Sequence, residues 1–451
     1  MRCEVDFYVS PASLAEPAKF VMEELLTSVG LSCPGLRISY GPVEDGPSPW
    51  LGPSQPWVHI RNAPSTQFST TPRELVVHEG VAIPAIGSSG QTPIIGHSPV
   101  TITFDLIATA FFFLAGLDTQ SRGLDVAGRP RYVGSVMASL RSRVPPVNAL
   151  LEVLADALRR AGARLVRPDA PGLCVTHDHD VTLRSLRGRL WGALRQLGGA
   201  PPALSYIVHG VNTLEELTRW ESQNQVPSTT FAWAGPSRGP LDRSTDTIGL
   251  ARVLRPEDTR VEVALHASSH TLTSDWSLER QARDLVELVG IRPRGVRMHN
   301  LIFDIERTSI QIEEARLDYD SSLAYPDFPA FATGFTYPHR LYSARLGRPF
   351  QFLEVPLFAM DESFRKYLLA PADEMEAAIV EAGDLVAVYG GTLTLLWHHH
   401  LGDDRFASGY GRRLRSSVMR LRERGLRPTT VSDAVRKRRA AYARVLVRVR
   451  S

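Results

Sequence analysis

Acidic and histidine side chains alternate in the sequence THDHD at residues 176–180, directly after the apolar run LCV. In a strand, successive side chains point to opposite faces, so Asp178 and Asp180 share one face. His177 and His179 then share the other face. Ionising two carboxylates this close to each other in a desolvated cleft costs free energy. A cation bound by one of them relieves that cost and leaves the other carboxylate as a base.

A second pair of candidate ligands is His266 and His270, which follow the apolar run VEVAL. Residues four apart lie on one face of a helical turn, so both imidazoles can reach the same ion. Together with Asp180 they supply two imidazoles and one carboxylate, which leaves open positions for water and substrate, as in a catalytic zinc site. We predict that these three residues bind one divalent metal ion, zinc first, with iron, cobalt, nickel or manganese as alternatives. Asp178 is then the predicted catalytic base.

Two further strand ends carry side chains suited to proton transfer or charge pairing. His398 lies just beyond the apolar run 392–396, where an imidazole can serve as the general acid for a leaving group. Arg297 follows Val296 and can orient a catalytic carboxylate, bind an anionic substrate group or form a structural salt bridge. We also predict that the substrate is contacted by His299, Asp320 and Trp397.

Short apolar strands alternate with helical patterns through the part of the chain that carries these residues. Strands are predicted at LCVTHDHD, ALSYIVHG, VEVALH, GVRMHNLIF, FLEVPLF and TLTLLWHHH. Helices are predicted near residues 183–197, 278–289, 309–315 and 371–382. This alternation is typical of parallel βαβ units, and its length suits a barrel. In such barrels reactive residues sit at the carboxyl ends of strands, where this chain places its His and Asp residues.

Three regions are predicted along the chain. Residues 1–165 form an N-terminal accessory domain, with a Pro-, Gly- and Ser-rich loop at 41–56 and helices at 103–117 and 147–161. The turn-rich segment RPDAPG, at residues 167–172, marks the boundary to the second region, a catalytic barrel over residues 166–430. Residues 431–451 form a basic C-terminal tail.

The composition is that of a folded protein without a membrane span. The chain has 451 residues, of which 43% are hydrophobic and 22% charged. Its three cysteines, Cys3, Cys33 and Cys174, have unrelated spacings, which favours a reducing compartment. The N-terminus shows no signal peptide pattern. The apolar segment 100–117 contains Asp105 and is interpreted as a buried helix rather than a transmembrane one. We therefore expect a cytoplasmic protein.

The charge is concentrated at the C-terminal end. The formal net charge is +3, but seven basic residues lie between Arg436 and Arg450, and without them the charge becomes −4. No basic face for nucleic acid is implied. The tail is interpreted as a solvated terminal helix, with contact to an anionic membrane as the alternative. A homo-oligomer is compatible with the sequence.

The motif order THDHD, HASSH, VRMH and LWH resembles the NodB-homology polysaccharide deacetylases over roughly residues 100–425. It is most similar to a branch with the first motif T-x-D-x-D and an extra N-terminal domain. The segments FDLIATAFFFLAG, LDYDSSLAYPDF and LEVPLFAMD support this resemblance. It implies an α/β fold: a distorted (β/α) barrel of the polysaccharide deacetylase type, preceded by a smaller α/β or α+β N-terminal domain.

The resemblance also implies roles for the candidate site residues. Asp178 corresponds to the catalytic base, Arg297 to the residue that positions it, and His398 to the general acid. The metal ligands implied are Asp180, His266 and His270. The implied reaction is metal-dependent hydrolysis of an N-acyl group on an amino sugar, in which the metal stabilises the tetrahedral oxyanion.

Three features depart from the family pattern. His177 and His179 stand where simpler members have an aromatic residue and a second Asp. Arg297 is followed by Met-His-Asn rather than a proline-containing turn. The absence of an export signal favours a nucleotide-linked or lipid-linked N-acylated sugar over an extracellular polymer, as in capsule or O-antigen biosynthesis.

Two other hypotheses remain open from the sequence. His177 and His179 form an HxH pair like that of amidohydrolase barrels, which would give a C–N hydrolase with its metal on the opposite face of the strand. Alternatively, the barrel is a non-catalytic carbohydrate-binding homologue. Occupation of all acid, base and ligand positions by competent residues argues against the second hypothesis.

Overall fold

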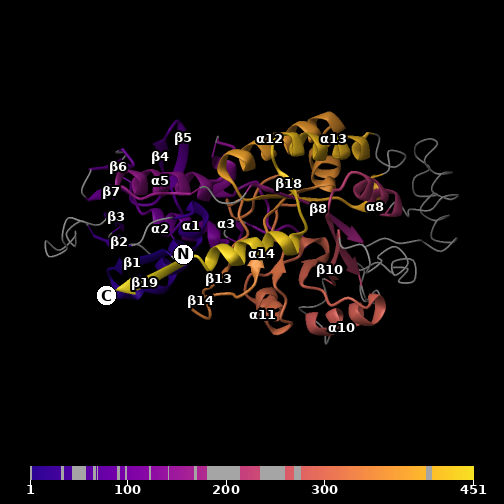
Figure 1. Ribbon diagram of the computed structural model, residues 1–451, viewed down its shortest axis with the longest axis horizontal. Helices are drawn as coiled ribbons and strands as arrows, with labels where there is room; N and C mark the ends of the chain where they lie inside the picture. Colours follow the sequence, from indigo (N-terminus) through magenta and orange to yellow (C-terminus); the bar gives the residue numbers. More distant parts are fainter. Residues whose placement is uncertain are drawn as a thin grey trace.

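The structure is a computed structural model that describes most of the chain. The described residues are 3–31, 35–42, 57–63, 68, 70–88, 92–96, 99–120, 123–140, 142–166, 170–179, 214–233, 260–268, 276–402 and 409–450. Within them, two main sheets lie side by side along the long axis of the molecule (Figure 1). The smaller sheet contains both the first and the last strand, and the larger sheet carries the candidate site.

The larger sheet is a parallel, barrel-like sheet. Its strands follow the order β15-β12-β11-β10-β9-β8-β17-β16, each parallel to its neighbour, and β18 also pairs with β8. The two edge strands, β15 and β16, are joined by only two residues, so the sheet must curl until its edges meet. This arrangement confirms the predicted α/β barrel. The strands are β8 (Gly172–His179), β9 (Ser228–Trp233), β10 (Val261–Ala267), β11 (Gly295–Met298), β12 (Tyr319–Asp320), β15 (Leu353–Glu354), β16 (Leu357–Met360), β17 (Thr392–Leu396) and β18 (Arg427–Pro428).

Helices cover the outside of this sheet. In Figure 1, α12 and α13 lie above the strands, and α10 and α11 lie below them. Helix α10 shows why the sequence is helical here: Ser277 caps its first turn, and Gly290 ends it in the left-handed conformation at φ 75°. The helices are α8 (Leu214–Gln223), α10 (Leu278–Val289), α11 (Arg307–Glu314), α12 (Ala372–Tyr389), α13 (Tyr410–Glu423) and α14 (Val431–Tyr442), with a short hairpin of β13 (Tyr342–Ser343) and β14 (Arg348–Pro349).

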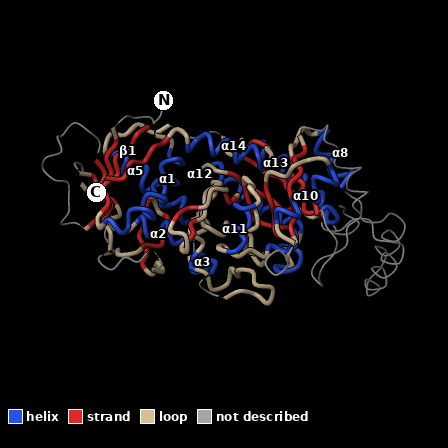
Figure 2. Tube along the Cα trace, turned by 90° about the horizontal axis from the view of Figure 1, so that it is seen from below, coloured by secondary structure: helices blue, strands red, loops and turns tan. Residues whose placement is uncertain are grey.

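The smaller sheet has the order β19-β1-β2-β3-β7-β6 and is parallel except for the β6–β7 pair. Figure 2 shows it with α1, α2 and α5 at one end of the molecule, opposite α8 and α10. Its elements are β1 (Cys3–Val9), β2 (Leu36–Gly41), β3 (Trp57–Arg61), β6 (Ile94–Ile95), β7 (Val100–Ile102), β19 (Val445–Arg450), α1 (Ala15–Val29), α2 (Leu106–Leu114), α3 (Leu117–Gln120), α4 (Val136–Ser139) and α5 (Pro146–Arg160), with a separate hairpin of β4 (Glu74–His78) and β5 (Val81–Ala85).

The apolar segment 100–117 forms part of the core of this region. Every residue of α2 is buried, and Asp105 caps the helix by accepting a hydrogen bond from the backbone N–H of Ala108 at 2.8 Å. Because α2 is completely buried within the protein, the protein core accounts for its apolar composition. No helix among the described residues is both long and apolar enough to cross a bilayer.

Most predicted elements in the described ranges are present. Helices near 147–161, 278–289, 309–315 and 371–382 correspond to α5, α10, α11 and α12. Strand β9 was not predicted, although it lies between β8 and β10 in the sheet. Its sequence STTFAW lacks the apolar alternation used to find the other strands. The helix predicted near 183–197 and the strand ALSYIVHG lie outside the described residues.

The basic C-terminal segment differs from the predicted solvated helix. Helix α14 packs between the two sheets, and β19 pairs in parallel with β1 over six residues. The sequence VLVRVR has the period-two alternation of a strand, which buries Val447, while Arg448 and Arg450 bind Glu4 and Asp6 at the surface. Because the segment is rich in arginine, its composition suggested a solvated helix, and the alternation typical of a strand was overlooked.

Candidate active site

The candidate site lies at the carboxyl edge of the larger sheet. Because neighbouring strands are parallel, their carboxyl ends meet at one edge. Asp178 is near the end of β8, His266 is in β10, and Arg297 is in β11. His398 follows β17 by two residues. The structure thus brings together residues that are up to 220 positions apart in the sequence.

Arg297 holds the Asp178 carboxylate in a fixed position. The Arg297 side chain is fully buried, and its Nη1 donates hydrogen bonds to Asp178 Oδ1 at 2.9 Å and to Thr176 Oγ1 at 2.7 Å. Its Nε and Nη2 donate to the backbone oxygen and Oγ of Ser321 at 2.8 and 2.9 Å. The guanidinium also lies 4.0 Å from the centre of the Phe231 ring. These contacts hold Arg297 rigidly and orient the Asp178 carboxylate.

His266 presents one defined ring nitrogen to the site. Its Nδ1 lies 3.1 Å from the carbonyl oxygen of Arg297 and 3.9 Å from Asp178 Oδ2. A carbonyl oxygen can only accept a hydrogen bond, so Nδ1 carries the proton and Nε2 carries the lone pair. Metal-binding histidines are commonly oriented by such a hydrogen bond on their other nitrogen. The chemistry of His266 therefore fits a divalent metal ion.

The other two predicted ligands, Asp180 and His270, lie outside the described residues. Among the residues that the structure does describe, no group of three His, Cys, Asp or Glu side chains is placed to hold a metal. His266 does not lie on a helical turn, as the HxxxH spacing suggested, but within β10 itself. The metal-binding triad stays a prediction.

His398 is held by a carboxylate that the sequence reasoning missed. Asp361, directly after β16, accepts a hydrogen bond from His398 Nδ1 at 2.7 Å and another from the His398 backbone N–H at 2.6 Å. Asp361 is fully buried, and this burial raises its pKa above the usual value, although His398 opposes the shift. The His398 side chain remains 14% exposed, so its ring is oriented yet accessible. The only sequence signal was the position of Asp361 at the end of the segment LEVPLFAMD.

Both ring nitrogens of His177 form hydrogen bonds within the protein. Its Nδ1 lies 3.0 Å from the carbonyl oxygen of Trp397, and its Nε2 lies 2.7 Å from Glu221 Oε1. Burial lowers the pKa of His177, but the Glu221 carboxylate outweighs this effect and raises it overall. Since both partners are acceptors, both ring nitrogens donate, and neither keeps a lone pair for a metal. This geometry argues against the amidohydrolase hypothesis based on an HxH pair.

The predicted alternation of faces along β8 is present for its described residues. Asp178 contacts Arg297 within the barrel-like sheet, whereas His177 contacts Glu221 of the covering helix α8. His179 stacks on His399, with ring centres 5.2 Å apart. The two faces of the strand therefore have different surroundings, as a period of two requires.

The three predicted substrate contacts occupy different environments. His299 packs edge-on against His266 and Trp233, with ring centres 5.3 Å away in both cases, and so borders the site. Trp397 is buried in an apolar cluster beside Tyr410. Their roles in substrate binding, like that of Asp320, stay predictions.

Asp320 belongs to a buried pair of carboxyl groups at the ends of β12 and β15. It accepts hydrogen bonds from the backbone N–H and the Oγ of Ser322, both at 2.7 Å, and lies next to Glu354. Burial raises the pKa of Asp320, and burial together with Asp320 raises that of Glu354 well above its usual value. Burial of the two neighbouring carboxyl groups thus disfavours the state in which both carry a negative charge.

Comparisons with known proteins give similarity in structure only. No model of a known protein family matches the chain, and no curated protein matches it. Among solved structures, a protein from Mycobacterium smegmatis assigned to the polysaccharide deacetylases is 17% identical, with a TM-score of 0.41 over 63% of this chain and 95% of that one. Puue allantoinase is 15% identical, with a TM-score of 0.42 over 60% and 89%. The polysaccharide deacetylase Bc1974 from Bacillus cereus is 12% identical, with a TM-score of 0.31 over 58% and 91%.

Proposed function

We propose that this protein is a metal-dependent hydrolase that removes the N-acyl group from an amino sugar, as members of the T-x-D-x-D branch of the polysaccharide deacetylases do. The observation that carries the proposal is the placement of Asp178 between the guanidinium of Arg297 and the ring of His266, 2.9 and 3.9 Å away. The His398–Asp361 pair lies at the same edge of the sheet. A base, an acid and a histidine with a defined lone pair are the parts that amide hydrolysis requires.

Each protein group has a distinct task in this proposal. Asp178 accepts a proton from the attacking water, and Arg297 keeps its carboxylate oriented. His398 donates a proton to the departing amine, while Asp361 stabilises the protonated ring. Asp180, His266 and His270 would hold a divalent metal ion, zinc first, and this ion would supply Lewis-acid polarisation of the amide carbonyl.

The proposed substrate is an N-acylated sugar linked to a nucleotide or lipid, used in making capsule or O-antigen in the cytoplasm. This part of the proposal depends on the sequence resemblance alone. The domain division at residues 165 and 430 also stays a proposal. Strand β19 belongs to the same sheet as β1, β2, β3, β6 and β7, so the proposed accessory domain would include β19 as well.

Metal content tests the proposed site directly. Purified wild-type protein should contain about one divalent ion per chain by elemental analysis, whereas Asp180→Ala, His266→Ala and His270→Ala should each lose most of it. His177→Gln serves as the control, because His177 keeps no lone pair for a metal. Equal metal content in all variants would contradict the triad, and loss only in the control would revive the HxH hypothesis.

Amine release tests the reaction. Asp178→Asn should retain the metal but release amine from N-acetyl amino sugars about 10² to 10⁴-fold more slowly, the usual contribution of a general base. A metal-loaded wild-type protein that releases no amine from nucleotide-linked, lipid-linked or free N-acyl sugars would favour the non-catalytic carbohydrate-binding hypothesis. Such a protein should still bind one of these sugars.

A further inference from the structure

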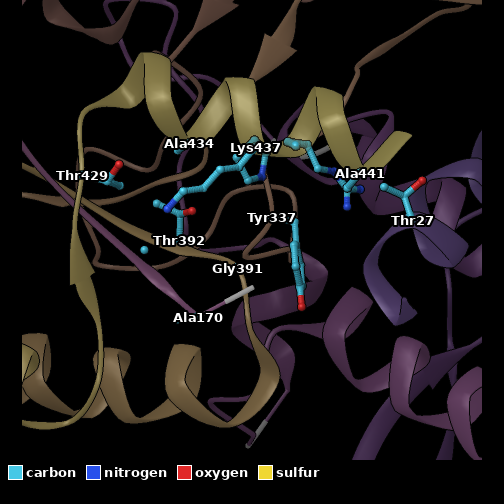
Figure 3. Close-up of a pocket in the computed structure, with 12 residues that line it drawn as sticks. Thr27, Ala170, Tyr337, Gly391, Thr392, Thr429, Ala434, Lys437 and Ala441 are labelled. Carbon is cyan, nitrogen blue, oxygen red and sulfur yellow. The ribbon is translucent and has the colours of Figure 1, made fainter. Parts of the chain in front are cut away.

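A small cavity lies at the end of the larger sheet opposite the candidate active site. Its volume is about 70 Å³, and its floor is formed by Gly172 at the start of β8 and by Gly391 and Thr392 at the start of β17. Thr27 of α1 and residues 434–441 of α14 form its walls (Figure 3). The cavity thus lies where the N-terminal sheet region, the barrel-like sheet and the C-terminal helix meet.

Two of the lining residues carry buried polar atoms for which the described residues supply no partner. Thr27 is 4% exposed and Arg438 is 5% exposed, and neither Thr27 Oγ1 nor Arg438 Nε has a hydrogen-bond partner among the described residues. The hydroxyl-bearing side chains of Thr392 and Thr429 line the same space and are also buried. Hydroxyl and guanidinium side chains therefore border the cavity from α1, α14 and the start of β17.

The charge around the cavity is positive. Lys437 and Arg438 are the charged side chains among the described lining residues, which include no carboxylate. The guanidinium of Arg438 is already compensated, because its Nη2 lies 3.1 Å from Glu24 Oε2. Lys437 makes no ion pair with any residue that the structure describes. Figure 3 shows its side chain extending along the cavity toward Thr392. Its positive charge, on an exposed residue, is therefore available to a ligand in the cavity.

Glycine keeps the floor of the cavity open. A Cβ atom at residue 172 would lie 3.1 Å from Thr392 Oγ1 and 3.4 Å from Thr429 Cγ2. Gly391 has φ 96°, a conformation that other residues rarely adopt, and a Cβ there would lie 2.5 Å from the carbonyl oxygen of Thr336. A side chain at residue 172 would therefore crowd Thr392 and Thr429, and one at residue 391 would clash with Thr336.

We propose that this cavity binds a small oxyanion of the size of phosphate. A single water needs about 10–15 Å³ of such space, so the cavity has room for a group of several heavy atoms. Its polar lining consists of hydroxyl, ammonium and guanidinium groups, which can all donate hydrogen bonds, and an oxyanion can only accept them. The charge of Lys437 selects an anion over a neutral group of the same size.

This site is separate from the proposed catalytic one and does not depend on it. Gly172 and Asp178 lie six residues apart on the same strand, which places the two sites about 20 Å from each other. A bound anion would contact α1, the barrel-like sheet and α14 together. Its binding should therefore stabilise the assembled fold without entering the reaction.

Titration calorimetry with inorganic phosphate, at constant ionic strength in chloride, tests the proposal. Wild-type protein should bind one phosphate per chain, and Lys437→Met should weaken the dissociation constant at least tenfold. Arg436→Met is the matched control: it removes an equal charge from the neighbouring, likewise exposed position, but Arg436 does not line the cavity and pairs with Asp433. Thr392→Val, which keeps the shape and removes one hydroxyl, should also weaken binding in a protein whose circular dichroism is unchanged.

The same titration with a nucleoside diphosphate identifies the source of the anion. Phosphate binding alone assigns a free ion. Lys437-dependent binding of the nucleoside diphosphate alone assigns a phosphoryl group carried on a larger ligand, and both results support an oxyanion site. An absence of binding by both probes would overturn the proposal. Binding that Lys437→Met and Arg436→Met weaken equally would also overturn it, because it would indicate adventitious attraction to a basic surface.

Discussion

Asp361 holds His398 through two hydrogen bonds, one to the ring and one to the backbone, which fixes both the position and the orientation of the imidazole. Arg297 similarly fixes Asp178. In both pairs a buried partner restricts a side chain that would move a proton in the proposed reaction, so little reorganisation would be needed. At the scale of single residues, the site therefore depends as much on Asp361 and Arg297 as on the groups that would meet the substrate.

Replacing Asp361 by Asn tests this orientation. The amide keeps the shape but removes the negative charge that stabilises the protonated ring of His398. We expect kcat/KM to fall by up to about 10²-fold, and the alkaline limb of the pH–rate profile to move to lower pH. Glu362→Gln, at the partly exposed neighbouring position, should leave the profile unchanged. A fall in kcat/KM without a shift of the alkaline limb would show that Asp361 has only a structural role.

The buried Asp320–Glu354 pair predicts a pH dependence of stability. The pKa of Glu354 is raised well above its ordinary value of 4.5, so the folded protein keeps a proton that the unfolded chain releases. Stability from this group is then complete below pH 4.5 and is lost as the pH rises toward the folded-state pKa. The slope is at most about 1.4 kcal/mol per pH unit.

Urea unfolding at several pH values between 5 and 7 measures this effect. Wild-type protein should lose stability over this range, and Glu354→Gln should lose less, because the amide does not titrate. The exposed Glu314→Gln is the control and should follow the wild type. Parallel curves for all three proteins would contradict a raised pKa at Glu354.

At the scale of elements, β19 completes the edge of the smaller sheet. Its valines alternate with arginines, so one face packs on the core and the other carries ion pairs to β1. Without β19, the backbone of β1 would be an unpaired edge next to a hydrophobic core, which favours association with other chains. A segment that is basic in composition thus has a structural role in the sheet.

A substitution at Val447 tests the role of β19. Val447 is 3% exposed, and Val447→Asp places a charge in the core. We expect it to lower the free energy of unfolding by about 3 kcal/mol or more and to increase aggregation. Arg448→Ala removes only an exposed ion pair and should change stability by less than about 1 kcal/mol. Equal effects of the two substitutions, measured by thermal unfolding and light scattering, would show that β19 does not contribute to the core.

At the scale of the whole molecule, one buried carboxylate connects the N-terminal sheet region to the rest. Glu24 of α1 is fully buried and binds both Arg340 Nε at 2.8 Å and Arg438 Nη2 at 3.1 Å. Its pKa is lowered, because Arg340 and Arg438 together outweigh the cost of burial. Tyr442 donates a further hydrogen bond to Glu24. These contacts join α1, the segment before β13 and α14.

Glu24→Gln tests this connection. The substitution leaves two largely buried guanidinium groups without their shared counter-charge, and such a loss typically costs about 3–5 kcal/mol. Glu23→Gln is the matched control, because Glu23 also binds Arg340 but is partly exposed, and it should cost less than about 1 kcal/mol. Similar unfolding midpoints for both variants in denaturant would contradict the proposed role of Glu24.

The sequence alone determined which residues could do the chemistry and which elements carry them. Alternation along THDHD separated Asp178 from His177, and both side chains lie on the faces that this period requires. Apolar runs ending in polar residues located β8, β10, β11 and β17, because a buried strand that emerges at a site changes composition at that point. These signals depend only on neighbouring residues, so they can be recognised without knowledge of the fold.

Only the tertiary structure decided which partners these residues have. Asp361 meets His398 across 37 positions, Glu221 meets His177 across 44, and Arg297 meets Asp178 across 119. No local period encodes such pairings, because they depend on which strands and helices become neighbours. The same holds for β19, whose partner strand is at the other end of the chain, and for the cavity between α1, β17 and α14. Spacing in the sequence selects the candidate residues, and packing decides which side chains they contact.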